Sequence, residues 1–258
     1  MDCPNCGGTM VSLGNGKLKC RFCGNRMDDP NYKAPAAPAA APAPSAARGP
    51  AVETKSQGSF VFDKNINGVL EIECTFPTSI SSGSGFLING NYAVTNTHVV
   101  TNNSIPCNNI IVRLAGETIP ASIVALGDDQ GGHGSGVDLA ILKLARVPAK
   151  AVTVKLANFD SVKIGESVYV IGNSLGYGTC ITGGIVSDKC RKVDGHMLLM
   201  TDCAVNGGNS GGPIFNAAGD AIGAIVSGIT SAEGMNFAIP SNTVRNFLSR
   251  YITVPDVR

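Results

Sequence analysis

The sequence predicts an all-β domain of antiparallel strands, either a barrel or a sandwich. Three observations favour this class. The 258 residues include 32 glycines and 14 prolines but only 5% aromatic residues, a composition typical of many turns. Short apolar or alternating runs recur from about residue 51 to the end of the chain, separated by Gly, Asn, Asp and Ser clusters. Such even spacing over about 200 residues is typical of barrels and sandwiches.

The predicted elements follow from these runs in order. Apolar strands are expected at 85–88, 110–112, 140–142, 167–171 and 224–226. Asn89-Gly90 lies between two apolar runs and predicts a hairpin, because both central residues of a type I′ turn need positive φ. One helix is expected, near the C-terminus. Ser241 is its predicted N-cap, and the apolar face consists of Val244, Phe247, Leu248 and Tyr251.

Charge and hydropathy exclude several classes of protein. Twenty Lys and Arg against 19 Asp and Glu give a net charge of +1, which disfavours a strongly basic nucleic-acid binder. No apolar run approaches the roughly 20 residues that span a bilayer, and the first residues lack the features of an export signal. Five scattered cysteines show no framework spacing (Cys74, Cys107, Cys180, Cys190 and Cys203). Together these features predict a reduced, cytoplasmic protein with no membrane association.

Composition divides the chain into three segments: 1–32, 33–50 and 51–258. The first holds two pairs of cysteines. The second contains five Pro and nine Ala; proline at this density favours an extended, semi-rigid linker that spans up to roughly 55 Å. The third carries the predicted β domain.

The four N-terminal cysteines predict a zinc ribbon. Cys3 and Cys6, then Cys20 and Cys23, form two C-x-x-C-G motifs, and a two-residue gap lets both thiolates of a turn face one ion. Four sulfurs complete a closed, structural Zn²⁺ site, with no catalytic role for the metal. Two disulfides or an iron site are the alternatives. Because about 30 residues cannot fold on apolar burial alone, the metal would supply most of the stability.

The residues of this predicted ribbon indicate its binding partner less clearly than they indicate its metal. Residues 1–50 carry six Lys and Arg against three Asp and Glu, and a four-thiolate zinc site adds about −2. A local charge near +1 disfavours nucleic acid and favours a protein partner or a tethering role.

Three segments of the third region point to nucleophilic catalysis. Gly207-Gly208-Asn209-Ser210-Gly211-Gly212-Pro213 surrounds a serine with glycines, which leave its hydroxyl accessible and let consecutive amides point to one spot. His98 follows an apolar run in TNTHVV (95–100), and Asp138 precedes another in DLAILKL (138–144). The chain order His, Asp, Ser is that of trypsin-like proteases.

Residues from about 83 to 250 resemble the trypsin-like serine proteases, specifically the HtrA/Deg branch. The resemblance also includes GSGF at 83–86, IGNSLGYGTCITGGIVS at 171–187, TDCAVNGGNSGGPIFNAAGDAIG at 201–223 and GMNFAIP at 234–240. It implies a fold of two six-stranded antiparallel β-barrels (the chymotrypsin/trypsin-like fold), and a serine endopeptidase that cleaves unfolded or extended protein substrates without a catalytic cofactor. A trimer is one oligomeric state that it leaves open.

The resemblance also implies site residues. Ser210 would be the nucleophile, His98 the general base and Asp138 the residue that orients the imidazole. The amides of Gly208 and Ser210 would form the oxyanion hole. Residues 227–229 would pair with an extended substrate, and Ser227 matches the strand residue that lies beside the catalytic Asp. The base of the S1 pocket would fall near Ala204 and Val205, with a wall near Gly228 and Ile229. No charge lies at these positions, so small or medium aliphatic P1 residues are expected, with Asp202 as the nearby carboxylate that would change this preference.

The sequence departs from the pattern of these proteases at two points. Asn209 stands where trypsin has the Asp that pairs with a newly freed N-terminus, so activation by cleavage is not expected. HtrA proteases usually carry a PDZ domain after the protease, and none is expected here, because few residues follow the predicted C-terminal helix. Two alternative functions remain: a catalytically silent protease-fold binding module tethered by the ribbon, and a zinc-ribbon nucleic-acid adaptor.

Overall fold

The computed structural model describes residues 2, 4, 9–14, 17–20, 26–31, 33, 56–127, 137–193, 195–228 and 234–254, with the backbone alone at 13, 14, 20, 227 and 228. Contacts divide the chain into two units, Met1–Glu53 and Thr54–Arg258. The predicted linker lies outside the described residues except for Lys33.

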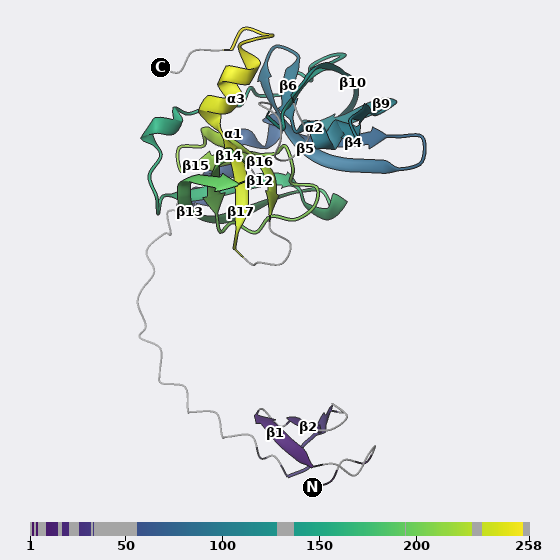
Figure 1. Cartoon of the computed structure of the whole chain (residues 1–258), viewed down its shortest axis with the longest axis vertical. Coiled ribbons are helices and arrows are strands. Elements are labelled where there is room, and N and C mark those ends of the chain that lie inside the picture. The colour runs from purple at the N-terminus through teal and green to yellow at the C-terminus, as the bar shows by residue number, and fades with distance from the viewer. Residues whose placement is uncertain are drawn as a thin grey trace, which may run out of the picture. The chain divides into compact units, whose positions relative to one another are not determined.

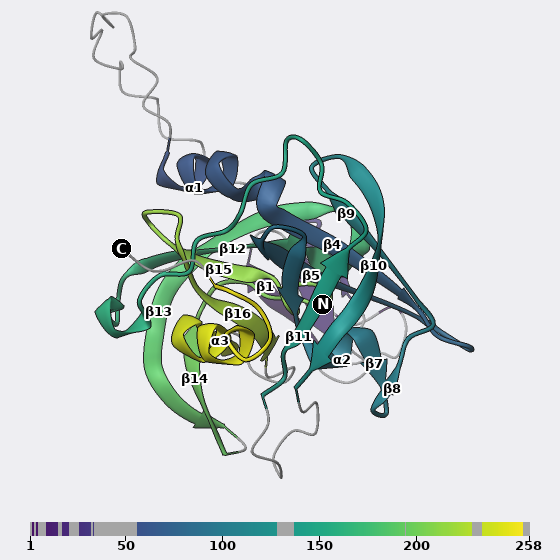
Figure 2. The same cartoon turned by 90° about the horizontal axis from the view of Figure 1, so that it is seen from above.

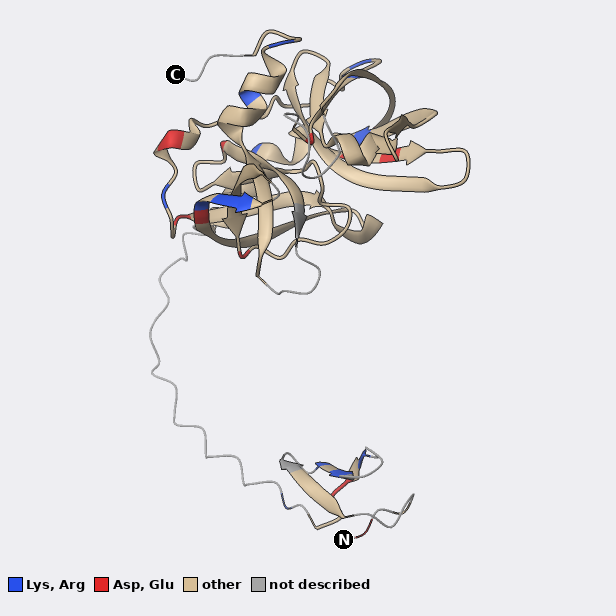
Figure 3. Cartoon of the chain, in the orientation of Figure 1, with Lys and Arg blue, Asp and Glu red and all other residues tan. Residues whose placement is uncertain are grey.

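The N-terminal unit contains a three-stranded antiparallel sheet. Its strands are β1 (Met10–Gly14), β2 (Lys17–Cys20) and β3 (Arg26–Asp28), in that order across the sheet. Met10 and Leu18 are buried, and Met27 packs against them. Basic residues lie on β2 and β3 (Figure 3), and the Lys17 side chain forms an ion pair with Asp28 on the opposite strand. The apolar core of this sheet is therefore very small.

The first barrel of the C-terminal unit closes in the strand order β10-β11-β6-β5-β4-β9. All neighbouring pairs are antiparallel. Alternate residues of β4, such as Leu70 and Ile72, are buried because successive side chains of a strand point to opposite faces. The six strands are β4 (Val69–Thr75), β5 (Ile80–Asn89), β6 (Tyr92–Thr95), β9 (Asn109–Leu114), β10 (Glu117–Leu126) and β11 (Ala140–Leu144).

The second barrel closes in the order β12-β13-β14-β17-β16-β15, again with antiparallel neighbours. Figures 1 and 2 show the two barrels from perpendicular directions. The prediction of an all-β fold of two six-stranded antiparallel barrels with a C-terminal helix is confirmed. The six strands are β12 (Ser167–Asn173), β13 (Thr179–Val193), β14 (His196–Thr201), β15 (Pro213–Asn216), β16 (Ala221–Gly228) and β17 (Asn236–Pro240).

One apolar cluster joins the two barrels. It combines Phe86 and Ile141 of the first barrel with Ile171 and Phe215 of the second, and it includes Phe247 of the C-terminal helix. Separate clusters fill each barrel. Because the joining cluster is buried, burial of apolar surface fixes the two barrels against each other.

Helices and short elements complete this unit. They are α1 (Gln57–Asn65), α2 (Thr97–Val100), α3 (Ser241–Leu248), three 3₁₀ turns at Ile66–Gly68, Phe159–Ser161 and Ser174–Gly176, and a small hairpin of β7 (Thr101–Asn102) and β8 (Ile105–Pro106). Of these helices, only α3 was predicted from the sequence. The polar helix α1 escaped it because only Val61 and Asn65 are buried there, so the helix shows almost no apolar periodicity.

Two local predictions need correction. The β5–β6 hairpin forms, but Asn89 pairs with Tyr92, so its two-residue turn is Gly90-Asn91 and only Gly90 has positive φ. Ser241 is the first residue of α3 and not its N-cap. Its hydroxyl donates instead to the buried carbonyl of Ala157, since a buried hydroxyl must find a hydrogen-bond partner.

Candidate active site

His98 and Asp138 meet directly. The backbone amide of His98 donates to Oδ1 of Asp138 at 3.0 Å, and the ring Nδ1 lies 2.6 Å from Oδ2. An ionised carboxylate only accepts hydrogen bonds, so the ring proton lies on Nδ1 and Nε2 is left as a proton acceptor. The His98 side chain is 43% exposed and the Asp138 side chain 19%, which leaves the imidazole accessible while the carboxylate is largely shielded.

Neighbouring contacts hold this pair in place. His98 lies in α2, just after β6, and Asp138 lies just before β11, the strand that pairs with β6. Asn96 donates from Nδ2 to the Asp138 carbonyl at 2.7 Å, and Thr97 donates from Oγ1 to the Leu139 carbonyl at 2.8 Å. Hydrogen bonds therefore join residues 96–97 to residues 138–139 beside the imidazole–carboxylate contact.

Ser210 lies on a turn between the two barrels. Its carbonyl accepts the Ser84 amide of β5 at 2.8 Å, and the following Gly211 amide donates to Ile225 of β16 at 2.8 Å. The Ser210 hydroxyl is half-buried and donates to the Val226 carbonyl at 3.3 Å. The structure thus anchors Ser210 to both barrels, with its hydroxyl directed to β16 and not to His98.

Two glycines bring this turn against the segment that carries His98. A Cβ atom at Gly83 would fall 2.6 Å from the Val99 side chain and 3.3 Å from the Ser210 carbonyl oxygen. A Cβ atom at Gly211 would fall 2.9 Å from the amide nitrogen of Asn96. Because only glycine permits such approaches, the motif glycines bring together segments that lie more than one hundred residues apart.

The turn before Ser210 presents two backbone amides. Among the described residues, neither the Gly208 nor the Ser210 amide donates a hydrogen bond. The carbonyl of Gly207 accepts the Leu175 amide at 2.7 Å, which fixes the plane of the peptide that carries the Gly208 N–H. Buried backbone donors are nearly always paired, so free amides beside a serine are suited to binding an oxyanion.

Ser84 holds the same turn from the first barrel. Its hydroxyl donates to the Gly208 carbonyl at 2.6 Å and accepts the Asn173 amide at 2.9 Å, and the residue is fully buried. Gly208 has φ +92°, and a Cβ atom there would fall 2.1 Å from the Asn173 carbonyl oxygen. Sequence reasoning did not select Ser84 as a functional residue, because only the tertiary contact distinguishes it from other serines in β5.

The predicted substrate-binding residues lie around β16. Ser227 and Gly228 pair with β17, while the pairing of β16 with β15 ends at Ala224. Beyond that point the other edge of β16 is not paired with any strand among the described residues. The structure places exposed Ala204 and half-buried Val205 just before the serine turn. Ile229 lies outside the described residues.

The family described as "Trypsin-like peptidase domain" matches residues 83–223 of the chain. The chain belongs to the trypsin-like peptidase family. The matched segment contains the His98–Asp138 pair, the Ser210 turn and Ser84, and its own strands come from both barrels. The candidate site and the family domain are thus the same part of the molecule.

Curated relatives of this trypsin-like domain include HtrA-type proteases. The chain is 34% identical over 180 residues to the "Probable periplasmic serine endoprotease DegP-like" of Brucella suis, covering 67% of this chain and 33% of that protein. It is 38% identical over 168 residues to a protein of the same name from Pseudomonas fulva, covering 62% and 32%. The chain therefore spans about a third of the length of these relatives.

Solved structures of proteases also resemble this domain. The "HtrA-type protease AlgW with tripeptide" superposes with a TM-score of 0.66 at 28% identity, covering 76% of this chain and 63% of that one. The serine endoprotease from Yersinia pestis superposes with a TM-score of 0.66 at 26% identity, covering 77% and 68%. These comparisons support an HtrA-type serine protease.

The predicted cytoplasmic location is wrong. The relatives from Brucella suis, Pseudomonas fulva and Haemophilus influenzae are all named periplasmic. The prediction depended partly on unpaired cysteines, but Cys74 and Cys203 are buried among apolar side chains. A buried thiol packs as a small apolar group in any redox compartment, so scattered cysteines carry little information on location.

No helix among the described residues is long and apolar enough to cross a membrane.

Two other features lie outside this site. Cys3, Cys6 and Cys23 are not among the described residues, and only the backbone of Cys20 is, at the end of β2. The described part of the chain contains no group of three or more His, Cys, Asp or Glu arranged to bind a metal.

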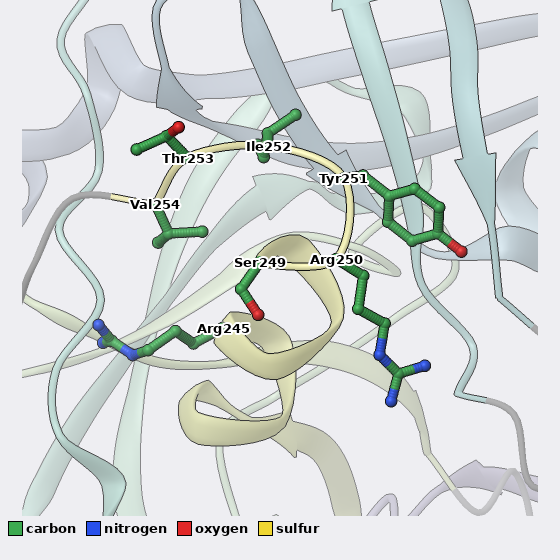
Figure 4. Close-up of a pocket in the computed structure, with 7 residues that line it drawn as sticks. All are labelled: Arg245, Ser249, Arg250, Tyr251, Ile252, Thr253 and Val254. Carbon is green, nitrogen blue, oxygen red and sulfur yellow. The ribbon is translucent and has the colours of Figure 1, made fainter.

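A pocket of about 500 Å³ lies at the end of α3 (Figure 4). It is lined by Arg245 and residues 249–254, and it contains none of the predicted site residues.

Proposed function

We propose that the trypsin-like domain is a serine endopeptidase that hydrolyses extended protein substrates through His98, Asp138 and Ser210. The observation that carries this proposal is the double contact of the Asp138 carboxylate with His98, to the backbone amide at 3.0 Å and to Nδ1 at 2.6 Å. A carboxylate in this position fixes the tautomer in which Nε2 accepts a proton, and it stabilises the imidazolium that results.

Acylation begins when the Ser210 hydroxyl turns from the Val226 carbonyl toward His98. Nε2 takes the hydroxyl proton while Oγ attacks the carbonyl carbon of the scissile peptide bond. The protonated His98 then gives this proton to the leaving amine, the C–N bond breaks and an ester forms at Ser210. In the second half, His98 takes a proton from water, whose oxygen attacks the carbonyl carbon of the ester. The C–O bond to Ser210 then breaks, Oγ takes the proton back from His98 and the acid product leaves.

The free amides of Gly208 and Ser210 stabilise the negative charge on the substrate carbonyl oxygen in both halves. The Leu175 amide and the Ser84 hydroxyl keep the turn in the required conformation by binding the carbonyls of Gly207 and Gly208. Donors fixed before the reaction need no reorganisation as the charge develops, which is why this term is large.

Residues 227–229 bind the substrate backbone. The edge of β16 beyond Ile225, whose own backbone groups are bonded to Gly211 and Gly212, offers backbone groups to an extended peptide, which would add as a further antiparallel strand. Ala204 and Val205 line an S1 pocket that prefers small or medium aliphatic P1 side chains. The nearby Asp202 carboxylate is turned toward β13, where its Oδ1 accepts the Ile185 amide at 2.7 Å.

The test compares wild type with Ser210→Ala on unfolded casein. We expect cleavage by wild type and a rate reduced by about 10⁴-fold or more in the variant. Ser249→Ala is the matched control, and this variant should cleave casein as wild type does. The Ser249 hydroxyl is exposed and donates to the Asn246 carbonyl at the end of α3. If wild type is silent and a fluorophosphonate fails to label Ser210, the catalytic proposal is wrong and the silent binding module is favoured.

We also propose that residues 1–32 form a zinc ribbon, joined by the linker 33–50 to the protease domain at 51–258. Cys3, Cys6, Cys20 and Cys23 would hold a structural Zn²⁺. The small core of Met10, Leu18 and Met27 supports this proposal, because so little buried apolar surface cannot by itself stabilise a sheet. Purified protein should contain about one zinc per chain, and Cys20→Ser should lose it while Cys180→Ser keeps it. A zinc-free wild type after reconstitution would exclude the site.

A further inference from the structure

The first barrel brings two cysteines into one apolar cluster. Cys74 lies near the end of β4, and Cys107 lies two residues before β9. Cys107 packs against the cluster that contains Cys74. Burial, and next the neighbouring Cys107 thiol, raise the pKa of the Cys74 thiol. Neither residue belongs to the proposed catalytic or zinc-binding sets.

Backbone hydrogen bonds hold the two cysteines in this position. Strands β4 and β9 are neighbours, with Cys74 opposite Ile110. The Asn108 amide donates to the Thr75 carbonyl at 2.8 Å, and the Cys107 amide donates to the Val100 carbonyl at 2.9 Å. The backbone beside each cysteine is therefore fixed by the barrel, which keeps both thiols at the same apolar cluster.

The two thiols differ in access. Cys74 has no exposed surface, whereas Cys107 is half-buried. Thiol–disulfide exchange needs one sulfur that an external reagent can reach and a second that can resolve the mixed disulfide. Cys107 is the sulfur that an external reagent can reach, and Cys74 is the sulfur that can resolve the mixed disulfide.

We propose that Cys74 and Cys107 are a redox pair that closes to an intramolecular disulfide. The oxidant is a low-molecular-weight disulfide. The Cys107 thiolate attacks one sulfur of the oxidant and releases one thiol, which leaves a mixed disulfide on Cys107. Cys74 then loses its proton and attacks the Cys107 sulfur, which releases the second thiol. Two protein thiols are oxidised and one external disulfide is reduced, with two protons passing from the protein to the released thiolates.

The disulfide would enclose the segment that carries His98. Residues 74–107 include β5, β6 and α2, and the Cys107 amide is bonded to Val100, two residues after His98. Closing a loop of about 30 residues removes conformational freedom from the unfolded chain. Oxidation should therefore raise the Tm of the domain by about 5–15 °C.

The experiment oxidises the full-length protein with glutathione disulfide at about pH 8.5, an alkaline pH chosen because burial raises the pKa of the Cys107 thiol. Mass mapping without reduction should find one peptide pair joined through Cys74 and Cys107, reversed by dithiothreitol. If both thiols react with iodoacetamide once the oxidised protein is unfolded, the proposal is wrong. This measurement needs no variant.

Thermal denaturation of variants gives the second test. Cys107→Ser should lose the oxidation-dependent rise in Tm, while Cys180→Ser, which removes an exposed thiol of β13, should keep it. The N-terminal cysteines are present in all three proteins, so their oxidation cannot account for a difference. A rise in Tm that persists in Cys107→Ser would overturn the proposal.

Discussion

The buried hydroxyl of Ser84 provides a measurable test of how the first barrel supports the serine turn of the second. In Ser84→Ala, the Gly208 carbonyl loses a donor at 2.6 Å and the Asn173 amide loses an acceptor at 2.9 Å. Ser84 has no exposed surface, so water does not readily replace the missing hydroxyl. The substitution therefore leaves two buried backbone groups without partners.

The expected cost follows from these two groups. A buried polar group that loses its partner costs about 1–3 kcal/mol, so Ser84→Ala should lower the free energy of unfolding by about 2–6 kcal/mol. For a domain of this size, that loss lowers Tm by roughly 4–24 °C. Under the proposed mechanism, kcat should also fall by about 10-fold or more, because the Gly208 amide would no longer be held toward the oxyanion.

The assay is urea denaturation together with casein cleavage, with Ser82→Ala as the control. Ser82 lies in the same strand but is exposed, so its replacement should change stability by less than about 0.5 kcal/mol. If Ser84→Ala and Ser82→Ala are equally stable, the two hydrogen bonds of Ser84 contribute nothing and the reasoning is refuted. If stability falls but kcat is unchanged, Ser84 does not position the oxyanion turn.

Three further predictions concern other parts of the site and the core. Asp138→Asn should lower kcat by about 10³–10⁴-fold with little loss of stability, because an amide that donates to Nδ1 favours the wrong tautomer of His98; near-normal peptidase kinetics would contradict this. Gly211→Ala should destabilise the domain by at least about 3 kcal/mol in urea denaturation, since φ is +81° and the new Cβ would fall 2.3 Å from the Ser84 carbonyl oxygen. Burial raises the pKa of the Cys203 thiol, so above about pH 9 the unfolded chain loses a proton that the folded domain keeps, and stability falls by up to about 1.4 kcal/mol per pH unit. In Cys203→Ala the urea midpoint should therefore decline less between about pH 8 and 10, and an unchanged slope would show that this thiol does not contribute.

Much of the fold was predictable from local pattern. The apolar runs at 85–88, 140–142 and 224–226 are strands in the structure, because alternation and β-branched residues report burial on a pleated surface. The helix α1 and the exact position of the 89–92 turn were not predicted. Both depend on contacts with distant segments: Asn65 of α1, for example, donates to the Gly219 carbonyl.

The sequence by itself determined the catalytic candidates. His98, Asp138 and Ser210 stand in motifs whose chemistry is local: a serine between glycines, and a His and an Asp at strand ends. Tertiary structure alone decided that Asp138 binds the backbone amide and the Nδ1 of His98, that Ser84 supports the Gly208 turn and that Cys107 packs against the cluster of Cys74. These contacts join residues far apart in the chain, and barrel closure sets them through strand register, which no local pattern encodes.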